Sequence, residues 1–209
     1  MRILAIETAS EACSVALYED AQRIAHDHRE LGRGHAERLV PMIEALPEKG
    51  RADRILVSLG PGSFTGIRIG IATARALGVA WQAEVLGYPT LALVAKCGQH
   101  SSPKPVTVCM NGGHGEWFVG DFAPDKTLGE VRSLTPQAAL ERGAQQVIKG
   151  NRAKELAEAL GEEHTAFNLL PDSGAVHLLE EVWLTRDLTP IYGRAPDATP
   201  QAAGGGKPA

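Results

Sequence analysis

Short apolar runs alternate with amphipathic segments over the first hundred residues of the chain. The run 12–18 alternates apolar and polar positions, as a half-buried strand does, whereas 35–46 repeats apolar residues at helical spacing. Pro41 lies inside that second segment and predicts a kink or a helix start near it. In chain order we predict strands over 2–8, 12–18 and 22–29, a helix over 35–46, a strand over 54–59, a helix over 64–80, a strand over 85–87 and a helix over 90–97.

The order strand, glycine-rich turn, strand begins again after residue 105. The stiff polar segment 101–105 is therefore the predicted boundary between an N-terminal lobe, 1–100, and a C-terminal lobe, 101–194. Residues 195–209 are rich in Ala, Pro and Gly and predict a disordered tail. In the second lobe we predict strands over 106–110, 116–122 and 146–148, a helix capped by Asn151 and ending at Leu160, and a helix capped by Asp172 that contains Leu178, Leu179, Val182 and Trp183.

The segment 60–78 joins a glycine-punctuated loop to a helix that has almost no polar face. Apolar side chains surround the helix axis, and its only charges, Arg68 and Arg75, share one narrow stripe. A helix that is apolar all round must be buried on more than one side. A shallow groove is formed by small residues at every fourth position: Gly66, Gly70, Ala74 and Gly78. The helix is therefore either buried wholly within its own domain, or packs on its sheet with one side and on a partner protein with the other.

The glycine loop does not match the fingerprints of nucleotide or hydrolase sites. Gly60, Gly62 and Gly66 miss GxGxxG by one residue, and no GxxxxGK[ST] occurs. Ser63 lacks the glycine neighbours of GxSxG and is predicted to cap the following helix instead. We assign no catalytic residue.

The seven histidines contain no HxxxH or HExxH pair that would place two imidazoles on one helix face. His26 and His28 point the same way from a predicted strand, but two ligands without a third favour a solvated edge over a metal site. His35 falls on the apolar side of its helix, which favours a packed histidine. No metal site is predicted.

The composition excludes some classes of function. Of 209 residues, 44% are hydrophobic and 22% charged, with a net charge of −4 and a pI of about 6.0, which argues against a broad phosphate-binding surface. The three cysteines form no CxxC pair, which fits a reducing cytoplasm. No uncharged run of 18 apolar residues occurs, so no membrane span is predicted.

Two tight turns carry a candidate vestigial nucleotide site. An acid in such a turn can hold Mg²⁺ against phosphates, yet one turn carries a Glu and the other only an Asn. Two ordinary hairpins are the alternative interpretation. The residues concerned are Glu7, Thr8 and Ser10 in the first turn and Asn111, Gly112 and Gly113 in the second.

These motifs resemble the TsaB (YeaZ) family, relatives of TsaD in the fold superfamily of actin, sugar kinases and Hsp70. The resemblance runs from residue 1 to about 195. It rests on ILAIETASEACSVAL, RGHAERLVPMI and GPGSFTGIRIGIATARAL, with weaker matches at GEWF and PIYGR. It implies a two-lobed α/β protein of the actin-like and Hsp70-like ATPase (ASKHA) fold, with a mixed sheet and helices in each lobe.

The resemblance also implies a non-catalytic cytoplasmic subunit. Such a subunit pairs with TsaD and the ATPase TsaE in transferring a threonylcarbamoyl group to the adenosine beside the anticodon of certain tRNAs. It contacts tRNA only through the complex, forms a homodimer when alone, and binds no cofactor by itself, with ATP and Mg²⁺ at the assembled complex. The partner helices are 35–46 and 64–80, which pack against their counterparts as a four-helix bundle. The expected interface residues are His35, Leu39, Met42, Ile43, Leu46, Ile67, Ile69, Gly70, Ala74 and Leu77.

The chain departs from the family pattern at both turns. Glu7 replaces the usual Asp, and Asn111-Gly-Gly-His114 replaces the common Asp-Ala-Arg-Arg, which weakens an independent nucleotide or tRNA site. The HxxxH ligands of TsaD are absent, consistent with a catalytic metal in the partner. Two alternatives stay open: a small ATPase or kinase-like transferase that uses Glu7 between the lobes, and a metallopeptidase-like protein, for which no ligand pair is found.

Overall fold

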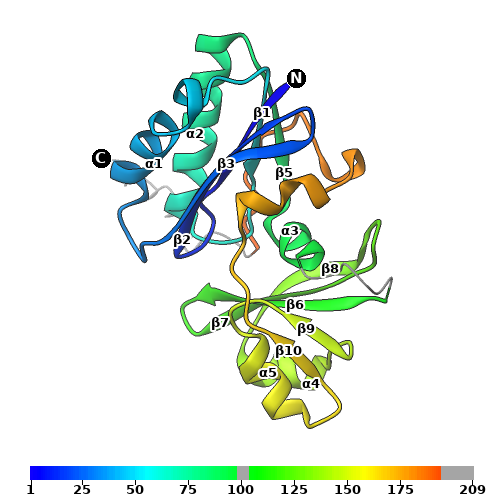
Figure 1. Cartoon of the computed structure of the whole chain (residues 1–209). Helices are drawn as coiled ribbons and strands as arrows, with labels where there is room; N and C mark the ends of the chain where they lie inside the picture. The colour runs from blue at the N-terminus through cyan, green and yellow to red at the C-terminus, as the bar shows by residue number, and fades with distance from the viewer. Residues whose placement is uncertain (98–103, 194–209) are drawn as a thin grey trace, which may run out of the picture.

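Two five-stranded sheets form the framework of the chain, one in each lobe (Figure 1). The computed structural model describes residues 1–97 and 104–193. The strands of the first sheet are β1 (Arg2–Glu7), β2 (Ala12–Glu19), β3 (Gln22–Glu30), β4 (Arg54–Ser58) and β5 (Glu84–Tyr88). They lie in the order β3-β2-β1-β4-β5, with β1 antiparallel to β2, β2 antiparallel to β3, and β4 and β5 parallel to β1.

The second sheet repeats the order of the first. Its strands are β6 (Val106–Gly113), β7 (Glu116–Phe122), β8 (Thr127–Leu134), β9 (Val147–Lys149) and β10 (Thr165–Phe167). They lie in the order β8-β7-β6-β9-β10, with the first three antiparallel in turn and the last two parallel to β6. Each lobe therefore contains three antiparallel strands followed by two parallel ones, and the sequence predicts only the first part of this repeat, the order strand, glycine-rich turn, strand.

The helices occupy equivalent places in the two halves. In the first lobe α1 (His35–Glu44) follows β3, and α2 (Phe64–Trp81) connects β4 to β5. In the second lobe α4 (Pro136–Arg142) follows β8, and α5 (Ala153–Leu160) connects β9 to β10. After the last strand of each half comes a third element, α3 (Thr90–Lys96) in the first half and the 3₁₀ helix η2 (Ser173–Leu178) in the second. Two further 3₁₀ helices are η1 (Pro47–Gly50) and η3 (Glu181–Trp183).

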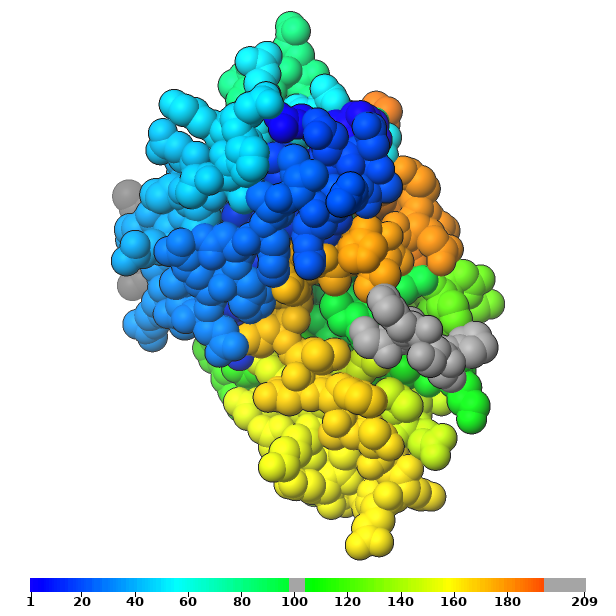
Figure 2. Space-filling model, viewed as in Figure 1, coloured from blue at the N-terminus to red at the C-terminus, as the bar shows by residue number. Residues whose placement is uncertain are grey.

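Each half places its third helical element against the sheet of the other half. On α3, Leu91 and Val94 join the core of the second lobe with Val108 and Phe118. On η2, Val176 packs into a cluster of the first lobe that also contains residues of β1, β2 and β4. Figure 1 shows α3 between the two lobes, and Figure 2 shows the orange C-terminal segment lying against the blue first lobe. Within the predicted C-terminal lobe, 101–194, η2 thus packs on the first sheet, whereas Trp183 belongs to the core of the second lobe.

The small residues of α2 pack on the chain's own first lobe. A Cβ added at Gly66 would lie 2.0 Å from the Thr8 carbonyl oxygen, and one at Gly70 would lie 2.4 Å from Thr8 Oγ1. At the other end of α2, a Cβ at Gly78 would lie 2.4 Å from a methyl group of Val85 on β5. The groove of small residues therefore lets α2 approach the first sheet and its turn, and it is not available to a partner helix.

Several local predictions differ from the structure. Asn151 does not cap α5, because its side chain binds elsewhere, whereas Asp172 Oδ1 accepts the Gly174 N–H and caps a 3₁₀ helix as predicted. That helix stops at residue 178 and does not continue to Trp183. α1 begins at residue 35 and continues past Pro41 instead of starting there. β8, α4 and β10 were not predicted. The predicted tail, 195–209, and most of the boundary segment lie outside the described residues.

We expect Gly66→Ala to lower the free energy of unfolding by about 2 kcal/mol or more, because the new methyl group would overlap the Thr8 carbonyl. Helix propensity alone predicts the opposite, a gain of about 1 kcal/mol. Urea denaturation followed by circular dichroism measures the change. The control is Ala72→Gly on the exposed side of the same helix, which should cost about 1 kcal/mol. A stabilised Gly66→Ala variant would contradict the packing described here.

Candidate partner surface and inter-lobe contacts

The predicted interface residues lie mostly inside the first lobe. Most side chains of this set form the core between α1, α2 and the first sheet, so a partner cannot touch them in this fold. Ile69 and Leu77 are only partly buried and pack at the margin of that core. The residues of the predicted interface that are buried are His35, Leu39, Met42, Ile43, Leu46, Ile67, Gly70 and Ala74. These residues hold the two helices against the first sheet. His35 is a packed histidine, as predicted, since its Nε2–H donates to the Ala12 carbonyl.

The opposite side of the two helices exposes apolar side chains. On α2, Phe64 is 53% exposed and Val79 is 85% exposed, and on α1 Val40 is 55% exposed. The small residues Ala72 and Ala76 lie between them on the outer side of α2 and are exposed as well. We call these five residues the outer face. The most exposed apolar residues of these helices are therefore not the ones named from the sequence.

An arginine and two aromatic rings mark the beginning of the outer face. The Arg68 guanidinium carbon lies 3.7 Å from the centre of the Phe64 ring, a cation–π contact, and Arg68 Nε donates to Tyr192 OH at 3.0 Å. The Phe64 and Tyr192 rings are 5.1 Å apart. Tyr192 reaches this place because the Ile191 N–H donates to the Leu59 carbonyl. Hence Tyr192, which belongs to a weak sequence match, completes the α2 surface.

The first predicted turn site is built into the lobe and is closed to ligands. Glu7 is fully buried: its Oε1 accepts the Ala9 N–H at 2.7 Å, and its Oε2 accepts from Tyr88 OH at 3.3 Å. Thr8 Oγ1 donates to the Gly66 carbonyl, and Ser10 Oγ accepts the Ala12 N–H. These polar groups are used within the turn, so in this fold they do not face a nucleotide.

The N-terminus of α2 is likewise occupied by the chain itself. Ser63 Oγ accepts the Gly66 N–H at 3.2 Å, which confirms the predicted cap. The Ser63 N–H donates to the Ala9 carbonyl at 2.7 Å, and a Cβ at Gly62 would lie 2.0 Å from that same oxygen. A helix N-terminus attracts anions through free N–H groups. Here a backbone carbonyl of the β1–β2 turn takes that place.

A single asparagine joins the two predicted turns. Asn151 Nδ2 donates to Glu11 Oε1 at 2.7 Å, and Asn151 Oδ1 accepts the Asn111 N–H at 2.8 Å. β6 continues through Gly112 and Gly113, so the predicted turn shortens to the two residues before β7. The structure thus brings the two turns together, but it bridges them with protein side chains.

A buried lysine makes a second contact between the halves. Lys149 on β9 donates through Nζ to the Ala95 carbonyl at 2.9 Å and to the Cys97 carbonyl at 2.5 Å. Both carbonyls belong to the C-terminal end of α3, where a cation is favourable. Burial lowers the pKa of Lys149 to about 8. Lys149 therefore fixes α3 to the second sheet.

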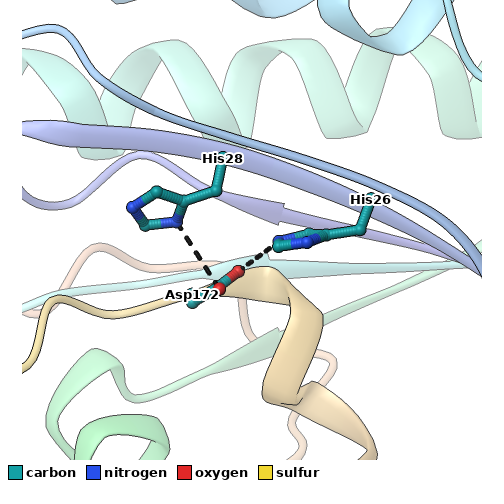
Figure 3. Close-up of side chains that lie close together, drawn as sticks. All are labelled: His26, His28 and Asp172. Atoms are coloured by element: carbon teal, nitrogen blue, oxygen red, sulfur yellow. Dashed lines mark hydrogen bonds and ion pairs between the residues drawn. The ribbon is translucent and has the colours of Figure 1, made fainter.

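Two histidines and an aspartate form a cluster at the edge of the first sheet (Figure 3). His26 Nε2 lies 2.6 Å from Asp172 Oδ1, and His28 Nδ1 lies 3.6 Å from Asp172 Oδ2. Sequence reasoning identified the shared direction of the two histidines but missed their acidic neighbour. Asp172 is 144 residues beyond His28, and only the return of the C-terminal segment to the first lobe brings them together.

Repeated sheets with exchanged third elements define a two-lobed α/β protein of the actin-like ATPase (ASKHA) fold. In the part of the chain that the structure describes, no helix is both long and apolar enough to cross a membrane. Residues 24–172 match the family model described as TsaD, tRNA N6-adenosine threonylcarbamoyltransferase.

Individual relatives agree with that match. The tRNA threonylcarbamoyladenosine biosynthesis protein TsaB of Escherichia coli (strain K12) is 42% identical over 101 residues, which is 46% of this chain and 43% of that protein. The TsaB protein of Buchnera aphidicola subsp. Schizaphis graminum is 30% identical over 133 residues, 60% of this chain and 62% of that one. The alignments thus span about half the length of these relatives.

A solved structure extends the likeness to nearly the whole chain. YeaZ from Pseudomonas aeruginosa superposes with a TM-score of 0.76 at 26% identity, covering 91% of this chain and 99% of that one. The chain therefore belongs to this TsaD-related family, in its TsaB (YeaZ) branch.

The buried carboxyl of Glu7 predicts a pH-dependent stability. Burial raises the pKa of Glu7 from 4.5 to about 7, against the lowering effect of its hydrogen bonds. Between these values the native state keeps a proton that the unfolded chain has lost, so the free energy of unfolding falls as pH rises from about 5 to 7. The contribution of Glu7 to that fall is on the order of 3 kcal/mol. Urea denaturation at several pH values should show this slope in the parent chain.

The control compares two amide variants. Glu7→Gln should make the free energy of unfolding fall less between pH 5 and 7. Glu37→Gln, on the exposed side of α1, should leave that pH dependence as it is in the parent chain. Parallel curves for the parent chain and Glu7→Gln would show that Glu7 does not titrate as its burial implies.

Proposed function

We propose that this chain acts in the biosynthesis of threonylcarbamoyladenosine in tRNA as a non-catalytic cytoplasmic subunit that binds TsaD. The family membership supports the pathway, because relatives in the TsaB branch carry that role in their names. In this proposal TsaE joins the complex, tRNA is contacted only through it, and two copies of the chain pair through the same helices when TsaD is absent. The catalytic metal belongs to TsaD.

The outer face of α1 and α2 carries this proposal. Most large apolar side chains of the chain are buried, but three on these helices are exposed to water: Val40, Phe64 and Val79. Aromatic residues and arginine are enriched where protein interfaces gain most of their binding energy, and Phe64, Arg68 and Tyr192 supply both kinds. A helical partner surface that covers this face would remove the exposed apolar area from water.

The polar groups of the turns support a scaffold over an enzyme. A nucleotide clamped between the lobes needs acids and N–H groups that face the ligand. Glu7 instead accepts from the Ala9 N–H and Tyr88 OH, Ser63 Oγ accepts the Gly66 N–H in the first turn of α2, and Asn151 bridges the two turns. ATP and Mg²⁺ are therefore assigned to the assembled complex and not to this chain alone.

Replacing Val79 with glutamate should weaken the complex with TsaD at least about tenfold, because a charge would then face an apolar partner surface. Ile69→Glu should act in the same direction. Isothermal titration of purified TsaD with each variant measures the effect. Ala74 is unsuitable for this test, because a charge at that buried position would disturb the fold itself.

A matched control is offered by Val182, which is 70% exposed but lies on η3, away from α1 and α2. Val182→Glu changes the same side chain at a similar exposure and should leave TsaD binding unaltered. Equal binding by Val79→Glu and the parent chain would refute the interface. Equal weakening by Val182→Glu would show that added negative charge, and not the outer face, is responsible.

The alternative of a small ATPase or kinase-like transferase is tested separately. We expect no saturable heat when Mg-ATP is titrated into the chain alone, since the first turn offers no free carboxylate. Micromolar binding that disappears in Glu7→Ala would favour the enzyme, provided that circular dichroism shows the variant to be folded.

A further inference from the structure

We propose that His26, His28 and Asp172 bind a zinc ion that fastens the returning C-terminal segment to the edge of the first sheet. The two histidines come from β3, and the aspartate comes from the loop that enters η2 (Figure 3). Figure 3 shows the two imidazoles converging on the carboxylate from the same side of the strand.

Local structure places the three side chains together. His26 and His28 are two apart on a strand and so project from the same face. In the register of the sheet, His28 lies opposite Ser14. Ser14 Oγ in turn accepts the Ser173 N–H at 2.9 Å, which holds the residue after Asp172 against the same strand pair. The aspartate is therefore positioned by backbone contacts that do not depend on the histidines.

The distances suit a small tetrahedral ion. Zinc lies about 2.0–2.2 Å from its N and O ligands, so two ligand atoms of a tetrahedron are about 3.4 Å apart. The two histidine-to-carboxylate distances, 2.6 and 3.6 Å, lie on either side of that value, and all three ligand atoms lie within 4.8 Å of one another. Small rotations of the side chains therefore suffice to enclose an ion.

His28 supplies a second observation that points to a ligand. Its Nδ1 is shielded from solvent and forms no hydrogen bond within the described part of the chain, because 3.6 Å to Asp172 is too long. An unsatisfied buried nitrogen costs free energy that an ion bound to its lone pair would remove. Asp172 Oδ1 also accepts the Gly174 N–H at 2.8 Å, which orients the carboxylate in the way that outer contacts orient metal ligands.

The donor atoms select the kind of ion. Arg23 lies beside the cluster, and its Nη1 donates to the Gly174 carbonyl at 2.8 Å. This positive charge lowers the affinity for every cation, so binding depends on coordinate bonds from the imidazoles, which Mg²⁺ and Ca²⁺ accept poorly. Two imidazoles and one carboxylate suit zinc, with a water molecule at the fourth position. The ion thus links β3 to the loop that enters η2.

The test uses the full-length chain, freed of any affinity tag and treated with a chelator, and titrates it with Zn²⁺ by calorimetry. We expect one saturable site per chain, together with the visible absorption of tetrahedral Co²⁺ when cobalt replaces zinc. His28→Ala and Asp172→Asn should each weaken binding at least about tenfold. The asparagine can still accept the Gly174 N–H, so this variant keeps the cap of η2.

The matched control is His114→Ala, which removes an exposed histidine from the turn between β6 and β7. It should leave both the stoichiometry and the affinity unchanged. Absence of saturable zinc binding overturns the proposal and leaves the cluster as an ion pair. Zinc binding that neither His28→Ala nor Asp172→Asn weakens overturns it as well, because the ion then binds elsewhere. The result does not depend on whether the chain binds TsaD.

Discussion

The contact between the β1–β2 turn and the beginning of α2 fixes the arrangement of the first lobe. The carbonyl groups of Thr8 and Ala9 occupy the space that side chains at Gly62 and Gly66 would need. At the same place the Ser63 N–H donates to the Ala9 carbonyl and the Gly66 N–H donates to Ser63 Oγ, so these two groups are not free to bind a phosphate. Because α2 is held with its small residues inward, its apolar outer residues must face water. One packing constraint therefore both closes the anion site and creates the surface proposed for TsaD.

The duplication of the fold explains how the two halves stay together. Each half ends in a short helical element that packs on the sheet of the other half, as Leu91 and Val176 do. Lys149 and Asn151 then add polar contacts between the halves. These contacts join the two lobes directly. The bridges favour a protein that presents surfaces over one that cycles between conformations.

The sequence was sufficient to predict the strands of the first sheet, three strands of the second and the helices of the first lobe, because periodicity and the Ser63 cap are local signals. The sequence analysis named the wrong face of α2 for the partner. Glycine spacing indicates that another backbone lies close to the helix, but it does not tell whether that backbone belongs to the chain's own sheet or to a partner. The role of Asp172 beside His26 was also out of reach, since it depends on a contact between residues far apart in the chain. β8 was missed because its eight half-exposed residues show little hydrophobic alternation, and β10 was missed because it has only three residues.

The return of residues 172–193 to the first sheet has a consequence for synthesis of the chain. Until that segment leaves the ribosome, the face of the first sheet formed by Ala5, Ala16 and Leu56 has no η2 to cover it. Exposed apolar surface of this kind is where incomplete chains aggregate. The first lobe, although made first, therefore reaches its final form last. A nascent chain stalled near residue 170 would be a client for chaperones, even though every strand of both sheets is already present.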